Sequence, residues 1–308
     1  MPDPIQTDDI ATAAARIASY VRTTPVLDLG HMLSDDWRLV LKLEHLQVTG
    51  SFKARGAFNL LLQLDADSGV VAASGGNYGK AIAFAADQLD RPAVVFVPKT
   101  SPEEKTGQIA RFGADVKVID GYYDDALEAS REHAESSGWP EAHAYDDPRV
   151  MAGQGTVGLE ISQQVGDASS VLVAVGGGGL IGGVASWYRG STRVIGVESE
   201  LCPTLHTARS EGAPVDVEVG GVAASSLGAR RVGLHPWTAN QWIEASVLVS
   251  DDAILDAQSW LWDSCRLWVE PAAATTVAAL REGIVEPGRG ETVVCLVSGA
   301  NVALAPTG

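Results

Sequence analysis

The stretch GSFKARG, residues 50–56, contains Lys53, one of only six lysines in the chain. Gly50 and Ser51 are typical of a helix start, and the residues that follow are apolar at helical spacing. Lys53 is therefore predicted in a first helical turn, where the helix dipole disfavours a cation and lowers the pKa of an amine. Two interpretations remain at this point. In the first, Lys53 and Arg55 both point to water. In the second, Lys53 is a neutral nucleophile able to attack a carbonyl.

Length and charge restrict the class of protein. The chain has 308 residues, 46% of them hydrophobic, enough for one large or two ordinary domains with a sizeable core. Its net charge of −17 and its pI near 4.6 argue against nucleic acid and membrane surfaces as partners. A small anionic ligand is compatible with this charge if backbone N–H groups bind it.

The N-terminus and the cysteines favour a cytoplasmic protein. The first residues are acidic and amphipathic, without the basic start and apolar core of a signal peptide. Cys202, Cys265 and Cys295 are widely spaced and odd in number, which predicts free thiols. Residues 171–188 are uncharged, but four consecutive glycines interrupt them, so we expect a strand, a loop and a helix there.

Apolar runs alternate with amphipathic segments along the whole chain. This pattern predicts an α/β protein with mainly parallel sheets covered on both faces. The number of runs favours two sheets. The expected strands are residues 70–74, 93–98, 115–120, 171–175, 193–198, 246–250 and 292–297, with helices expected over 78–89, 102–112 and 251–267.

Three small-residue turns follow expected strands, where ligands bind in such sheets. They are residues 73–81, 175–183 and 297–301. Each is either a tight turn or a place where backbone N–H groups approach an anion. The second turn also fits G-x-G-x-x-G at Gly177, Gly179 and Gly182, and the next strand ends at Glu198. A nucleotide-binding dehydrogenase is therefore an alternative, although it assigns no role to GSFKARG.

Taken together, these segments resemble the fold type II pyridoxal-phosphate enzymes, in the serine/threonine dehydratase group that includes serine racemase. KLEHLQVTGSFKARGA (42–57) is similar to that family's cofactor-lysine segment, SGGNYG (74–79) to its carboxylate loop and GGGGL (176–180) to its phosphate loop. The resemblance implies a tryptophan synthase β-like fold of two three-layer αβα domains. It places residues 1–68 and 148–308 in a large cofactor-binding domain and 69–147 in a small mobile one. Other similar segments are 146–161, 194–198, 222–228, 269–274 and 297–301.

The resemblance also implies roles for individual residues around pyridoxal 5'-phosphate. Lys53 would form the Schiff base, with Phe52 flanking the ring. Asn77 would bond the 3-hydroxyl, and Ser298 would face the pyridine nitrogen. A hydroxyl at that position can leave the nitrogen neutral, which favours β-elimination over transamination. The phosphate would be held by main-chain N–H groups of Gly176, Gly177, Gly178, Gly179 and Leu180, and Gly221 and Glu270 are further implied cofactor contacts.

The implied reaction is dehydration and deamination of threonine or serine to a 2-oxo acid and ammonia, with Lys53 as general base. The substrate carboxylate would meet Ser74, Gly75, Gly76, Asn77 and Tyr78. Gly75 replaces the second serine of racemase-like members, so racemisation should be weak or absent. Glu198 matches one ligand of the family's cation site, but Thr204 replaces another, which makes a divalent or monovalent cation doubtful.

Two alternative functions remain open besides that of a dehydrogenase. One is β-replacement, as in cysteine synthesis, and another is a cofactor-carrying protein that has lost turnover. The family resemblance also suggests a homodimer. The sequence does not select the preferred hydroxyamino acid.

Overall fold

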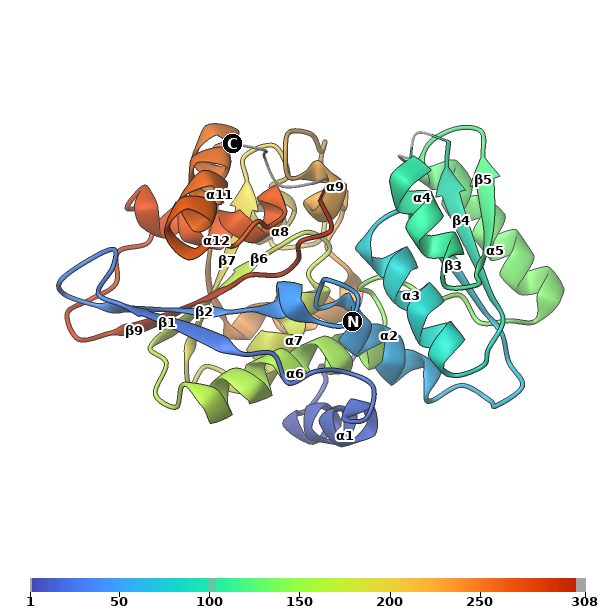
Figure 1. The fold of residues 1–308 in the computed structure, drawn as a ribbon, viewed down its shortest axis with the longest axis horizontal. Helices are drawn as coiled ribbons and strands as arrows, with labels where there is room; N and C mark the ends of the chain where they lie inside the picture. Colours follow the sequence, from blue (N-terminus) through green and yellow to red (C-terminus); the bar gives the residue numbers. More distant parts are fainter. Residues whose placement is uncertain (1, 100, 102, 303–308) are drawn as a thin grey trace.

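The structure is a computed structural model that describes residues 2–99, 101 and 103–302. Within these residues the strands form two separate sheets of six and three strands (Figure 1). The seven expected strands are all present. Two further strands, β1 (Val26–Gly30) and β2 (Arg38–Lys42), were not expected.

The larger sheet has the strand order β1-β2-β9-β6-β7-β8. Strand β1 pairs antiparallel with β2, and the other neighbours are parallel. The last strand in the chain, β9, thus lies between β2 and β6 in the middle of the sheet. The bounds are β1 (Val26–Gly30), β2 (Arg38–Lys42), β6 (Ser170–Ala174), β7 (Arg193–Ser199), β8 (Ile243–Val249) and β9 (Thr292–Leu296).

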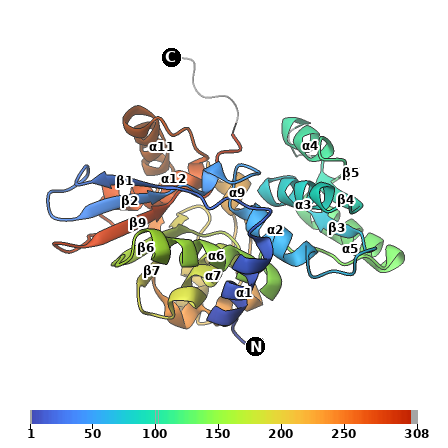
Figure 2. The same ribbon diagram turned by 60° about the horizontal axis from the view of Figure 1, so that its bottom comes forward.

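Helices cover both faces of the larger sheet (Figure 2). One face carries α11 (Asp251–Cys265) and α12 (Pro271–Arg281), and the other carries α1 (Thr7–Ile17), α6 (Pro148–Gln164) and α7 (Gly179–Tyr188). Successive strand residues alternate between the two faces. In β6, Leu172 packs into the first core and Val171 and Val173 into the second.

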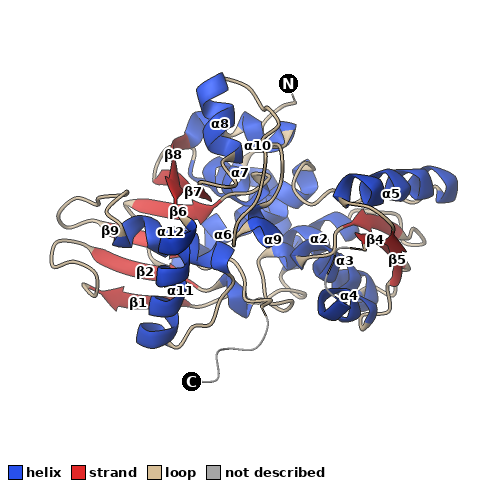
Figure 3. Ribbon diagram, turned by 90° about the horizontal axis from the view of Figure 1, so that it is seen from above, coloured by secondary structure: helices blue, strands red, loops and turns tan. Residues whose placement is uncertain are grey.

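The smaller sheet is parallel and is also covered on both faces (Figure 3). It consists of β3 (Val70–Ala73), β4 (Ala93–Pro98) and β5 (Asp115–Ile119). Helices α3 (Asn77–Gln88) and α4 (Glu103–Ala110) lie on one face, and α5 (Tyr123–Ser137) lies on the other. The predicted architecture of two three-layer units with mainly parallel sheets is therefore confirmed. The division into a large and a small mobile domain stays a prediction.

Helix α2 (Lys53–Leu61) begins later than the sequence suggests. Its N-cap is Phe52, which makes no side-chain capping bond, and Ser51 forms a bridge to Gly299. The apolar side of α2 packs into the same core as strand β3 and helix α3. The remaining short elements are η1 (Glu44–Leu46), α8 (Thr204–Glu211), α9 (Ala224–Leu227), α10 (Leu234–Thr238) and η2 (Asn240–Trp242).

Two minor expectations are confirmed. Residues 171–188 form the end of β6, a loop and α7, and no helix in the described part of the chain is long and apolar enough to cross a membrane. Cys202, Cys265 and Cys295 are free thiols.

Helices α2 and α6 touch through their backbones at Gly153. A Cβ atom at this position would lie 2.6 Å from the Arg55 carbonyl oxygen and 2.7 Å from the Gly56 Cα. We predict that Gly153→Ala lowers the free energy of unfolding by about 1–3 kcal/mol, because the two helices must separate. Chemical denaturation measures this change.

Gly107→Ala is the matched control, because Gly107 is also helical and a Cβ there would meet no atom within 4 Å. It should be neutral or slightly stabilising. Equal losses in the two variants would contradict close α2–α6 packing as the cause.

Candidate active site

The topology brings three distant segments to the carboxyl edge of the larger sheet. Strands β6 and β9 are parallel neighbours, so the loop after β6 and Ser298 after β9 emerge at the same edge. The start of α2 is attached there, because the Phe52 N–H donates to the Ser298 carbonyl oxygen at 3.1 Å. Lys53, Ser298 and the glycine loop therefore share one side of the fold.

The amine of Lys53 has no acidic partner in the part of the chain that the structure describes. Its Nζ donates to the Ala144 carbonyl oxygen at 3.2 Å and lies 5.0 Å and 5.7 Å from the ring centroids of Phe52 and Tyr78. The side chain is half-buried. Desolvation by the surrounding protein lowers the pKa of Lys53 to about 8, although the negative charge of Glu270 opposes this shift. The pKa is lowered as the sequence predicts, but burial is the main cause.

The loop of residues 176–179 can be built only from very small residues. A Cβ at Gly177 would lie 2.4 Å from the Tyr145 ring, and a Cβ at Gly176 would lie 3.0 Å from the Leu227 backbone. Gly178 is the N-cap of α7 with a φ of 91°, a conformation that favours glycine. The first N–H groups of α7, which include those of Gly179 and Leu180, have no acceptor within the helix, and residues 176–179 place no side chain of their own beside them. Such a loop suits a phosphate group.

Glu270 is the centre of a hydrogen-bond network at the same edge. This buried N-cap residue of α12 accepts from Asn77 Nδ2 at 2.9 and 3.0 Å and from Ser226 Oγ at 2.6 Å. It also accepts from the Asn301 N–H at 2.8 Å, and Asn301 Nδ2 donates to Asn77 Oδ1 at 2.7 Å. The network joins Asn77 in α3 to residues of the larger unit.

The predicted carboxylate loop lies between β3 and α3. The Gly76 N–H donates to Ser74 Oγ at 3.4 Å, and a Cβ at Gly75 would lie 2.3 Å from Ser101 Oγ. Tyr78 is buried, and its hydroxyl has no hydrogen-bond partner among the described residues. Burial raises the pKa of this hydroxyl well above its usual value.

Glu198 is engaged in fixing helix α8. Its carboxylate accepts from the N–H groups of Leu205 and His206 at 2.7 Å each and from Ser246 Oγ at 2.6 Å. Thr204 Oγ1 donates to the Ala229 carbonyl oxygen at 2.7 Å. Over residues 2–99, 101 and 103–302 no group of three acidic, histidine or cysteine side chains is arranged to hold a metal ion. The contacts of Glu198 therefore support neither a cation site nor a ribose site of a dehydrogenase.

In the described part of the chain, Gly221 shares no hydrogen bond or ion pair with Lys53. It is exposed, and a Cβ there would meet the Asp251 carboxylate and Leu201. Its place just before α9 puts it close in the chain to Ser226. Its predicted contact with the cofactor gains no support from these neighbours.

The structure adds residues to which the sequence assigned no role. Ser226 and Asn301 lie within the similar segments, but their contacts with Glu270 depend on tertiary structure. Tyr145 packs on the glycine loop, and its position carries no signal in a single sequence. Arg55 is only 1% exposed, so the interpretation that it points to water is wrong.

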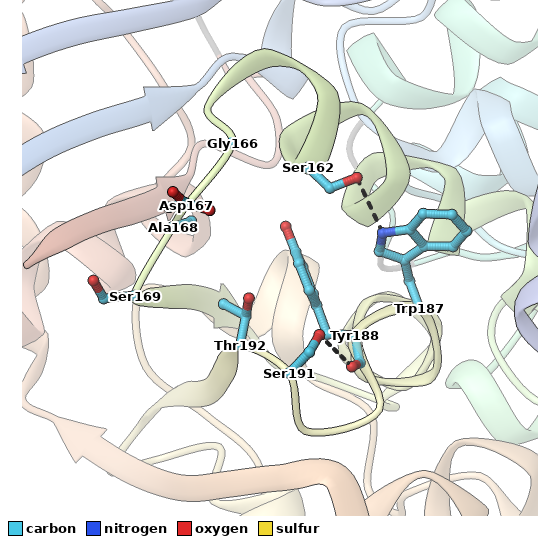
Figure 4. Close-up of a pocket in the computed structure, with 9 residues that line it drawn as sticks. All are labelled: Ser162, Gly166, Asp167, Ala168, Ser169, Trp187, Tyr188, Ser191 and Thr192. Atoms are coloured by element: carbon cyan, nitrogen blue, oxygen red, sulfur yellow. Dashed lines mark hydrogen bonds between the residues drawn. The ribbon is translucent and has the colours of Figure 1, made fainter.

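A separate hollow of about 590 Å³ lies at the amino ends of β6 and β7 (Figure 4). The side chain of Tyr188 points into it, and Trp187 Nε1 donates to Ser162 Oγ at 3.2 Å beside it. This hollow is at the opposite edge of the sheet from Lys53 and takes no part in the candidate site. Its other lining residues are Gly166, Asp167, Ala168, Ser169, Ser191 and Thr192.

The chain belongs to the family of pyridoxal-phosphate dependent enzymes, whose model matches residues 17–299. Within that family it is similar to proteins of the threonine dehydratase and serine racemase group, as its sequence suggests. An L-threonine ammonia-lyase of Geobacter sulfurreducens is 35% identical over 302 residues, covering 95% of this chain and 75% of the relative.

Two solved structures have the same fold as this chain. A threonine deaminase of T.th. matches with a TM-score of 0.92 and 34% identity, over 98% of this chain and 100% of that one. A serine racemase of Dictyostelium discoideum matches with a TM-score of 0.90 and 30% identity, over 97% and 99% of the two chains. The predicted fold type II architecture is thus confirmed.

The residues present fit the cofactor of this family. The side-chain-free loop at the start of α7 provides N–H groups for a phosphate, and Lys53 provides an amine that no described carboxylate neutralises. Phe52 and Tyr78 place aromatic surfaces near that amine.

The lowered pKa of Lys53 predicts a pH-dependent cost to stability. Below about pH 8 the folded, cofactor-free protein must hold a desolvated ammonium group, whereas the unfolded lysine is charged up to its ordinary pKa. Lys53→Met should therefore raise the Tm of the cofactor-free protein at pH 7. The gain should shrink as the pH rises above about 8, because the folded wild-type amine becomes neutral while the unfolded one still binds a proton.

Thermal unfolding from about pH 7 to about pH 10 measures the difference. Lys99→Met removes an exposed amine paired with Asp120 and should give no gain at neutral pH. A gain from Lys53→Met that stays constant over the whole range would exclude desolvation of the amine as its source.

Proposed function

We propose that this protein is a pyridoxal-phosphate-dependent ammonia-lyase that converts threonine or serine to a 2-oxo acid and ammonia. The observation that carries the proposal is the Lys53 amine, which lies without an acidic partner among the described residues at the sheet edge that also holds Ser298 and the glycine loop. The similarity to an L-threonine ammonia-lyase and to a threonine deaminase supports elimination from a hydroxyamino acid as the reaction.

When bound, pyridoxal phosphate supplies an aldehyde that captures the substrate amino group and a ring that accepts electrons from Cα. Lys53 Nζ then takes the Cα proton, for which it must be uncharged. Its lowered pKa provides a neutral amine at a pH only slightly above neutrality. The β-hydroxyl leaves with a proton as water, and water later replaces the amino group. Threonine thus gives 2-oxobutanoate and ammonia, and serine gives pyruvate and ammonia.

The N–H groups at the starts of α7 and α3 bind the two anions of the complex. Gly176 to Leu180 hold the phosphate, and residues 74–78 hold the substrate carboxylate. Neither place needs a lysine or an arginine, since helix starts offer unpaired N–H groups and partial positive charge. The Ser298 hydroxyl would face the ring nitrogen of the bound cofactor, where a hydroxyl in place of a carboxylate would leave that nitrogen neutral and favour elimination.

Gly75 limits the reaction to one face of the substrate. It has no side chain to deliver a proton opposite Lys53, so racemisation is weak or absent. Ser101 Oγ occupies the space beside Gly75 that a side chain would need.

Residues 69–147 form a small domain that closes over the substrate and excludes water. The contacts that support closure join α3 to the larger unit. They are the bonds from Asn77 to Glu270 and the bond of 2.7 Å from Lys80 Nζ to Asn301 Oδ1. A homodimer, a cytoplasmic location and a bound cation remain predictions from the family resemblance.

A panel of hydroxyamino acids assayed for 2-oxo acid release tests the proposal. We expect turnover of threonine or serine by the wild type and at least about a thousandfold loss in Lys53→Ala, because the proposed reaction uses this amine both to bind the cofactor and to take the Cα proton. Retained activity in Lys53→Ala would remove Lys53 from the mechanism. Faster formation of cysteine from O-acetylserine and sulfide than of pyruvate from serine would favour β-replacement instead.

The glycine loop gives a separate prediction about cofactor binding. In Gly177→Ala the added Cβ would collide with Tyr145, so the loop must move and its N–H groups lose their alignment. We expect the dissociation constant of pyridoxal phosphate to rise about tenfold or more, measured by titration of the cofactor-free protein. A companion variant, Gly177→Ala with Tyr145→Ala, removes the collision and should recover part of the affinity. Unchanged binding in Gly177→Ala would exclude this loop as the phosphate site.

A further inference from the structure

Four charged side chains are buried together behind helix α2. This charge cluster consists of Lys42 at the end of β2, Glu44 in η1, Arg55 in α2 and Glu160 in α6. Lys42, Glu44 and Arg55 are at most 1% exposed, and Glu160 is 9% exposed. Two positive and two negative groups make the charge cluster neutral overall.

Arg55 has most of the bonds in the charge cluster. Its Nε and Nη2 donate to the two carboxylate oxygens of Glu44 at 2.8 and 2.7 Å, and its Nη1 and Nη2 donate to those of Glu160 at 2.7 and 2.9 Å. Nη1 also donates to Thr156 Oγ1 at 3.1 Å. Two bidentate pairs of this kind fix both the position and the orientation of the guanidinium group.

Such a cluster is poorly explained by stability alone. The cost of removing four charges from water offsets most of their mutual attraction, and buried ion pairs replaced by apolar residues often leave stability unchanged or raised. The neighbouring charges lower the pKa of Glu44 and raise the pKa of Arg55, so both groups remain charged despite their burial. Desolvation of the four charges costs free energy. A role of the charge cluster in fixing the geometry of α2 accounts for its presence despite that cost.

Arg55 and Lys53 lie two residues apart in the first turn of α2. At about 100° per residue their side chains leave opposite sides of the helix. Lys53 extends to Ala144, whereas Arg55 extends to Glu44 and Glu160. The helix start has no side-chain cap, and the charged bonds of Arg55 add to the backbone bond from Phe52 to Ser298 in restraining the turn that contains Lys53.

Glu44 connects this restraint to the other end of the site. The next residue, His45, donates its N–H to the Val297 carbonyl oxygen at 3.0 Å, and Val297 immediately precedes Ser298. The Arg55–Glu44 pair therefore joins the segment of Lys53 to the strand end of Ser298. These two residues must reach opposite ends of one rigid ring under the proposed function.

We propose that Arg55 and Glu44 are positioning residues that set the placement of Lys53 relative to Ser298. The inference rests on the proposed function, since it assigns these two groups to one bound cofactor. Loosening the pair leaves the fold and substrate binding largely intact but misaligns the amine with the Cα proton. A misplacement of about 1 Å at a reacting group costs on the order of 100-fold in rate.

The test compares three variants of the holoenzyme with the wild type. Arg55→Met combined with Glu44→Gln removes one charge of each sign and keeps the Lys42–Glu160 pair, which is bonded at 2.6 Å. Arg55→Lys keeps the charge but cannot bind both carboxylates in a bidentate way. If the double variant fails to fold, Arg55→Lys still measures how a loosened Arg55–Glu44 pair affects kcat and dichroism. Lys42→Met is the control, because it disturbs the charge cluster without removing any bond of Arg55.

The measurements are kcat, KM, Tm and the visible circular dichroism of the bound cofactor per mole bound. We expect kcat of the double variant to fall about 10- to 100-fold with KM within about threefold, and the dichroism to lose at least about half its amplitude. Arg55→Lys should lie between the double variant and the wild type. Lys42→Met should lower Tm while kcat stays within about twofold and the dichroism is retained.

Wild-type kcat and dichroism in both Arg55 variants would overturn the inference. The inference would also be overturned if Lys42→Met lost kcat and dichroism as strongly as the Arg55 variants while its Tm fell. The charge cluster would then act on the site only through the stability of the fold. A wild type that binds the cofactor without turnover would instead refute the proposed function, and the dichroism comparison would still test the positioning.

Discussion

The structure depends on keeping one amine inside the protein without a carboxylate beside it. A lysine amine that is removed from water normally gains an acidic partner. Here Lys53 has a carbonyl oxygen and two aromatic rings as neighbours, and its pKa falls to about 8 through desolvation. The acidic group that acts on it, Glu270, is occupied by bonds from Asn77, Ser226 and Asn301. The surrounding structure therefore weakens proton binding by the amine without giving it an ion-pair partner.

An acidic chain can bind an anionic cofactor and substrate because the binding groups are local. The net charge of −17 repels anions at long range. Helix starts preceded by glycine place N–H groups against a ligand without adding any charged side chain. The glycine loop before α7 and the loop before α3 both have this form, and both follow the carboxyl ends of parallel strands.

Much of the fold follows from the sequence, for identifiable reasons. Strands buried on both faces are continuous apolar runs, so β3, β4, β6, β7 and β9 could be predicted from composition and spacing. Strand β2 was missed, and its sequence RLVLK includes a charged residue, Lys42, at a fully buried position. Its burial depends on Glu160, which is 118 residues away in the chain. The same long-range pairing explains why Arg55 was open to interpretation as a solvated residue.

The candidate site also contains some residues that the sequence singles out and others that it does not. Lys53 and the glycine turns stood out as candidates because they lie in short segments with characteristic composition, but the residues alone left two interpretations of each, and only the family resemblance assigned them roles. The contacts of Ser226, Asn301 and Tyr145 depend on how separate loops meet, and a single sequence does not contain that information. The start of α2 was misplaced because Ser51 pairs with Gly299 across the site instead of capping the helix.

The most direct measurement is borohydride reduction of the purified protein with bound cofactor, followed by peptide mapping. The account predicts that one residue carries the reduced pyridoxyl group and that this residue is Lys53. A label on any other lysine, or no label in a protein that holds the cofactor, would contradict it.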